Sequence, residues 1–92
     1  MQITEVTVSL ANEEKLRGFA NIVFENRFAV RGLKIIEHIG RLFIAMPSRK
    51  QKDGSFRDIA HPISTEFRAQ MEQAVLAKYW EEVHRTSVQG SG

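Results

Sequence analysis

The residues best suited to chemistry lie in one short stretch, PSRKQKDGSFRDIAHP, residues 47–62. Its four cations are Arg49, Lys50, Lys52 and Arg57. Between the first and the last of them lies one acid, Asp53, so this short segment carries a charge of +3. The rest of the chain holds nine Lys or Arg against ten acids. Because a polyanion responds to a local concentration of charge, the segment indicates contact with phosphates.

Asp58 and His61 suggest a second kind of chemistry, since a carboxylate and an imidazole can serve acid–base catalysis or metal binding. No third ligand accompanies them, so we expect no catalytic residue, no metal and no cofactor here. We expect His61 to lie at a strand-to-helix corner and Asp58 to offset Arg49 or Arg57. The chain has no nucleophile elbow, P-loop or dinucleotide fingerprint. We therefore expect that it is not an enzyme and has no small-molecule substrate.

The chain has the size and composition of one soluble domain, with 92 residues, of which 42% are apolar and 26% charged. It has no run of eighteen apolar residues that predicts a membrane span, and its first residues do not resemble a signal peptide. Cysteine is absent, which is compatible with a cytoplasmic location. We therefore expect a single domain over residues 1–86 and a disordered tail over 87–92.

Alternation of apolar and polar residues predicts β-strands in the first two-thirds of the chain. The expected strands cover residues 4–10, 19–24, 27–38, 42–46 and 55–60. We expect a tight turn at Glu25–Asn26, a bulge or close backbone approach at Gly32, and core positions at Ile22, Phe24 and Ile44. The predicted fold is α+β, with an antiparallel meander sheet of about five strands followed by one C-terminal helix packed on it.

Two apolar stripes characterise the helix expected after Ser64, which is a good N-cap. The first stripe should lie on the sheet and consists of Phe67, Met71, Ala74, Val75 and Tyr79. The second stripe is rotated from the first and consists of Leu76, Trp80 and Val83. It either wraps an edge of the same core or meets a second subunit. The second interpretation predicts a homodimer with these three residues at the interface.

A β-hairpin is expected between Pro47 and Pro62, with its turn at Asp53–Gly54. A two-residue turn would place Lys50 opposite Arg57, and a three-residue turn with Gly54 left-handed would place Arg49 opposite Arg57. In either register Arg57 faces a cation, which destabilises a strand pair by roughly 0.2–1 kcal/mol. Such a pairing suits a hairpin that binds phosphates. The alternative is that basic side chains keep an exposed hairpin soluble.

Phe56 is the one aromatic residue among these cations. Its ring could stack on an unpaired base, as aromatic residues do in single-strand-binding proteins. The more common role for such a residue is packing at the root of the hairpin, and both roles remain open at this point.

Three stretches, FIAMPS, DGSFRDIAHPI and QAVLAKY, resemble the signature of the stage V sporulation protein G (SpoVG) family. The resemblance extends over about residues 1–82. It implies a small bacterial α+β protein that forms dimers and has no shared enzyme activity. It also implies a regulator linked to septation and sporulation that binds DNA, and in some members RNA. The alternative is a protein-interaction module of the division or sporulation machinery that does not bind nucleic acid.

In this family the basic hairpin is implicated in nucleic-acid contact, so the resemblance implies that role for Arg49, Lys50, Lys52 and Arg57. One position departs from the family pattern. Lys52 stands where members often have a proline before Asp-Gly. The turn thereby loses a rigid φ angle, and its tip gains a charge.

Overall fold

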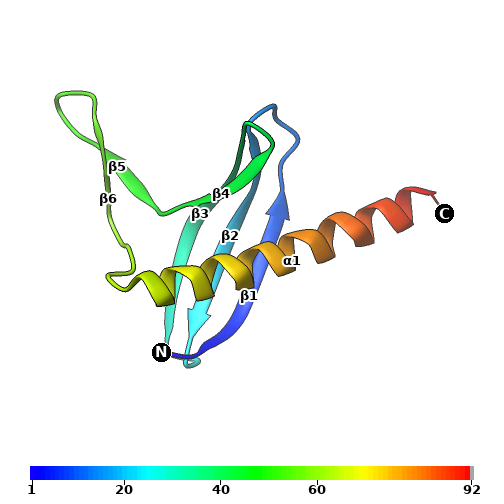
Figure 1. The fold of residues 1–92 in the computed structure, drawn as a ribbon, viewed down its shortest axis with the longest axis horizontal. Helices are drawn as coiled ribbons and strands as arrows, with labels where there is room; N and C mark the ends of the chain where they lie inside the picture. The colour runs from blue at the N-terminus through cyan, green and yellow to red at the C-terminus, as the bar shows by residue number, and fades with distance from the viewer. Residues whose placement is uncertain (92) are drawn as a thin grey trace.

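Four strands pair in chain order into one antiparallel sheet. They are β1 (Ile3–Leu10), β2 (Leu16–Phe24), β3 (Phe28–His38) and β4 (Arg41–Ala45). The computed structural model describes residues 1–91, with side chains described for residues 1–85. Short turns make neighbours in sequence also neighbours in the sheet, so the predicted meander is confirmed (Figure 1).

Two backbone features confirm the predicted turn and bulge. Glu25 and Asn26 both have positive φ, 51° and 55°, and the Arg27 amide donates to the Phe24 carbonyl at 2.9 Å. Gly32 has φ 81°, and its amide donates to the Asn21 side-chain oxygen at 3.2 Å. The pairing of β2 with β3 shifts at this point, which is how a bulge bends a long strand.

The helix α1 (Thr65–Ser91) lies across one face of the sheet and packs against β1, β2 and β4 (Figure 1). It begins where expected, since the Phe67 amide donates to the Ser64 hydroxyl at 3.1 Å. The sheet and the helix share one apolar core, made of Ala20, Ile22, Phe24, Leu33, Ile35, Ile44, Met46, Met71, Val75 and Tyr79. It includes the predicted core positions Ile22, Phe24 and Ile44, and Val75 from the first helical stripe.

The helix is long, and its backbone extends through Ser91. Side chains from residue 86 onward lie outside the described part, as does residue 92 altogether. The division into a domain over 1–86 and a disordered tail over 87–92 therefore stays a prediction. In the part of the chain that the structure describes, no helix is long and apolar enough to cross a membrane.

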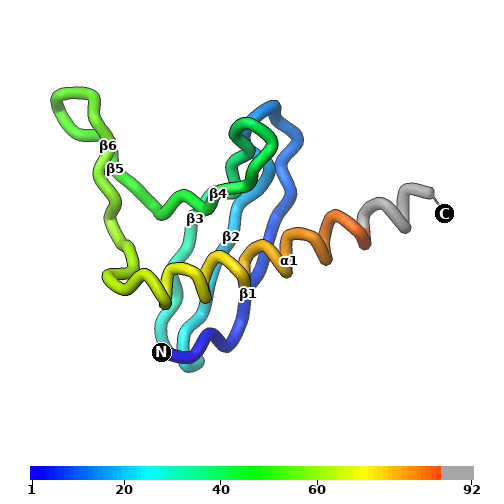
Figure 2. Tube along the Cα trace, viewed as in Figure 1, coloured from blue at the N-terminus to red at the C-terminus, as the bar shows by residue number. Residues whose placement is uncertain are grey.

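The chain between β4 and α1 forms a separate two-stranded hairpin of β5 (Ser48–Lys50) and β6 (Phe56–Asp58). The fifth predicted strand thus pairs only with β5 and does not join the main sheet. Pro47 has no amide hydrogen to continue the pairing after β4. All six residues of the hairpin strands are exposed and only Phe56 is apolar, so the hairpin has little apolar surface to bury against the sheet. It projects away from the rest of the fold (Figures 1 and 2).

Candidate nucleic-acid interface

The turn of the hairpin resolves the register that the sequence left open. Arg49 pairs with Arg57 and Lys50 pairs with Phe56, as expected for the three-residue turn. Gly54 has φ 92°, in the left-handed region that favours glycine. The Gly54 amide donates to the Gln51 carbonyl at 3.0 Å, and the Gln51 amide donates to the Ser55 carbonyl at 2.7 Å. Lys52 therefore occupies a central turn position without disrupting the turn.

Asp53 stabilises this turn through its carboxylate. Its Oδ1 accepts hydrogen bonds from the Ser55 hydroxyl at 2.6 Å and from the Ser55 amide at 2.9 Å. These bonds favour the charged form, so they hold the pKa of Asp53 below its ordinary value. The one acid of the basic segment thus bonds within the turn itself.

The four cations of the hairpin are exposed and unneutralised. None of Arg49, Lys50, Lys52 and Arg57 forms an ion pair with a described side chain. Asp58 also forms none among these residues and instead pairs across the hairpin with Ser48. The prediction that Asp58 offsets Arg49 or Arg57 is therefore wrong. The four side chains are thus exposed and not engaged by a described carboxylate within ion-pair distance.

An open, mostly polar hollow of about 530 Å³ lies where the hairpin returns toward α1. It is lined by Phe56, Arg57, Asp58, His61 and Arg68. Arg68 comes from the start of α1 and donates to the Ile44 carbonyl at 3.4 Å, with Glu72 at 3.9 Å. The sequence does not single out Arg68, because only the path of the chain from β6 into α1 brings it near Arg57. The hollow thus adds two nitrogen-bearing side chains, His61 and Arg68, to the predicted cations.

His61 lies in the connection between β6 and α1, at the corner predicted for it. Its Nδ1 is 3.2 Å from the Pro62 carbonyl. Among the side chains that the structure describes, no group of three or more His, Asp or Glu could hold a metal ion. Asp58, at the end of β6, and His61, in the connection that follows, therefore form no such group.

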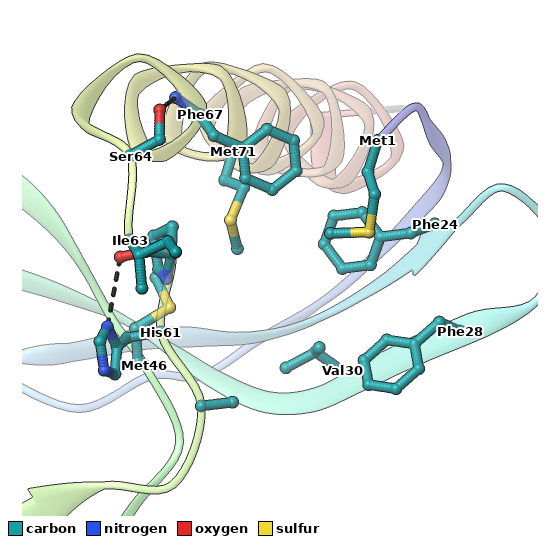
Figure 3. Close-up of a pocket in the computed structure, with 12 residues that line it drawn as sticks. Met1, Phe24, Phe28, Val30, Met46, His61, Ile63, Ser64, Phe67 and Met71 are labelled. Atoms are coloured by element: carbon teal, nitrogen blue, oxygen red, sulfur yellow. Dashed lines mark hydrogen bonds between the residues drawn. The ribbon is translucent and has the colours of Figure 1, made fainter.

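A second hollow is apolar and lies beneath the same connection (Figure 3). It has a volume of about 310 Å³, and Phe67 and Met71 of α1 face Phe24 and Val30 of the sheet across it. His61 lies at the rim of both hollows. The connection between β6 and α1 thus borders an apolar hollow that side chains do not fill completely.

The second helical stripe is divided between the core and solvent. Leu76 and Val83 are partly buried and pack against the core, as expected if this stripe wraps the core's edge. Trp80 is 56% exposed, and its ring meets Tyr79 edge-on at a centroid distance of 5.1 Å. Of the three residues predicted at a dimer interface, Trp80 offers the largest free apolar surface.

Comparison with known proteins identifies relatives over nearly the whole chain. The SpoVG family model matches residues 1–81. A protein of Anaeromyxobacter sp. (strain Fw109-5) is 49% identical, covering 92% of this chain and 88% of its own. A protein of Clostridium beijerinckii is 47% identical, covering 98% of this chain and 100% of its own. A protein of Clostridium perfringens is 48% identical, covering 97% of this chain and 99% of its own.

All three relatives carry the name "Putative septation protein SpoVG", which does not describe an enzyme. The residues that suggested the family lie in β4, in the hairpin and in α1, so the match includes the elements that build the basic arm. With the family model matching most of the chain and relatives close to half identical, the chain belongs to the SpoVG family.

Proposed function

We propose that this protein is a nucleic-acid-binding regulator linked to septation and sporulation, which binds DNA or RNA through the β5–β6 hairpin. The observation that carries the proposal is the projecting arm on which Arg49 faces Arg57 with no described carboxylate paired to either. Each cation that meets a phosphate releases counterions, which provides affinity without reading sequence. The link to septation rests on the names of the relatives.

The shape of the arm supports this proposal. A two-stranded ribbon fits the major groove of B-DNA, which is about 12 Å wide. The guanidinium of Arg57 offers a fork that can bond guanine bidentately, so it is the best candidate for a base contact. Lys50 and Lys52, near the turn, are suited to phosphates, because an ammonium acts as a point charge. The proposed function takes place in the cytoplasm and requires no catalysis and no cofactor.

A homodimer is part of the proposal. Two arms related by a two-fold axis would reach two related half-sites on a nucleic acid. Trp80 supports such an association, because a large ring that is more than half exposed on α1 would be covered at an interface. Leu76 and Val83, which are partly buried at the edge of the core, would form the border of this dimer interface.

The proposal is tested by fluorescence titration of labelled DNA and RNA across a salt series. We expect binding at low salt that weakens steeply as salt rises. The matched pair of variants is Lys50→Ala/Lys52→Ala against Lys78→Ala/Arg85→Ala, which removes the same charge from α1. Only the first should weaken binding on all sequences. Absence of binding to any nucleic acid at low salt would instead favour the protein-interaction module.

A further inference from the structure

Phe56 is an exposed aromatic residue in the middle of the proposed contact surface. It is 69% exposed and does not belong to the apolar core, so the expected packing role at the hairpin root is not what the structure shows. In the described part of the chain, neither hairpin strand packs against α1 or the main sheet. The ring is therefore free to meet a ligand.

The surroundings of this ring contain more cations than acids, since Asp58 is the one carboxylate that lines the same hollow as the ring. Lys50 stands directly opposite it across the hairpin, and Arg57 follows it in β6. The same ring lines the open hollow together with His61 and Arg68. A single exposed aromatic residue is ordinary on a protein surface. A ring set among cations that can hold a backbone is the arrangement with which proteins bind single strands.

We propose that Phe56 stacks on an unpaired nucleobase, so that the hairpin prefers single-stranded over double-stranded nucleic acid. This inference rests on the proposed function and names the class of ligand for the same site. In a duplex the faces of the bases are covered by their neighbours, and only their edges are accessible in the grooves. A ring such as Phe56 would have to unstack a base step to gain contact, which costs free energy.

The hollow gives the rest of the nucleotide a place. With its base against Phe56, a nucleotide would have its flanking phosphate within the hollow that Arg57 and Arg68 line together with Asp58. Arg68 is only loosely engaged by Glu72, at 3.9 Å, so its guanidinium retains donors for a phosphate. Both duplex and single-stranded ligands offer phosphates to these cations, whereas only a single strand offers an unpaired base on which Phe56 can stack. Phe56 is therefore the residue that should distinguish the two ligands.

The test compares the wild type with Phe56→Leu, which keeps an apolar side chain but removes the ring. Fluorescence anisotropy is measured on single-stranded DNA, single-stranded RNA and a duplex of the same sequence. We expect the wild type to bind single strands more tightly, and Phe56→Leu to lose about ten-fold on them while duplex binding changes little. Phe56→Tyr should restore single-strand affinity. Similar losses on DNA and RNA single strands would show that base stacking, not the sugar, is recognised.

A second readout follows stacking directly. Phe56→Trp in the otherwise unchanged chain should show fluorescence quenching with single strands beyond that of the wild type, whose one tryptophan is Trp80, and little change with the duplex. Equal affinity of Phe56→Leu and wild type for single strands, or preference of the wild type for the duplex, would overturn the inference and leave the proposed function standing. Failure of the wild type to bind any nucleic acid would overturn both.

Discussion

Arg49 and Arg57 lie directly opposite each other across the β5–β6 hairpin, and no described carboxylate pairs with either. Facing cations weaken the pairing of two strands. This arm packs on no other described element, so it has no tertiary contacts to offset that repulsion. A hairpin selected for stability alone would place an acid at one of these positions. The pair is understandable if its charges are neutralised by an external polyanion.

Replacing Arg49 by glutamate should therefore have opposite effects on the hairpin and on binding. An ion pair with Arg57 should stabilise the strand pairing by about 0.2–1 kcal/mol. Affinity for nucleic acid should fall about ten-fold or more, because a contact is lost and a repulsion gained. Amide hydrogen exchange at Gln51 reports the first effect, and titration reports the second. Arg27→Glu, with the same change in charge on a distant turn, is the control. Tighter binding by Arg49→Glu would contradict the account.

The turn should loosen in acid. The pKa of Asp53 lies below the ordinary 3.8 because the charged carboxylate accepts two bonds from Ser55. Its contribution to stability is present above the ordinary value and is lost as the pH falls through the lower folded value. An NMR pH titration should show the Gly54 and Ser55 amides shifting with this carboxylate. Asp53→Asn should remove the transition, whereas Asp58→Asn should leave it in place.

The core should respond strongly to truncation at Ile44, which is almost fully buried. Ile44→Ala should lower the free energy of unfolding by about 2–5 kcal/mol, measured by denaturant titration. The matched control is Ile63→Ala, because Ile63 is 95% exposed. That change should stay within about 0.5 kcal/mol. An unchanged midpoint for Ile44→Ala would show that the inward face of β4 has been assigned incorrectly.

Much of the fold could be predicted from local signals. Alternation gave the strands of the main sheet, Gly32 marked the bulge, and Ser64 marked the start of α1. Asp53–Gly54 predicted the hairpin but allowed two registers, since the choice depends on how Gln51 bonds across the turn. These features depend on residues close together in the chain, which is why sequence pattern was sufficient.

The features that escaped prediction depend on contacts between distant segments. The hairpin is separate from the main sheet because Phe56 is the only apolar residue of its strands, which becomes clear only once β4 has its neighbours. Arg68 reaches the hollow because α1 begins beside the hairpin's return. Leu76 and Val83 pack on the core because of the angle at which α1 crosses the sheet. No residue spacing in the sequence specifies that angle.

Self-association should depend on Trp80. We expect the wild type to sediment as a dimer at micromolar concentration, and Trp80→Ala to shift toward monomer while circular dichroism shows an unchanged fold. Leu76→Ala should instead lower the unfolding midpoint, because this side chain packs on the core. Sedimentation of the wild type as a monomer alone would contradict the dimer.

The central claim is that the hairpin is the nucleic-acid-binding arm, and the most direct test removes all four of its cations. The variant Arg49→Ala/Lys50→Ala/Lys52→Ala/Arg57→Ala is compared with Arg27→Ala/Lys34→Ala/Lys78→Ala/Arg85→Ala, which has the same net charge. Affinity for single-stranded and duplex DNA is measured across a salt series, with circular dichroism confirming the fold of each. The account predicts that only the hairpin variant loses affinity and that its log–log salt slope flattens by about 0.7–0.9 per lost contact. Unchanged affinity and slope in the folded hairpin variant would contradict it.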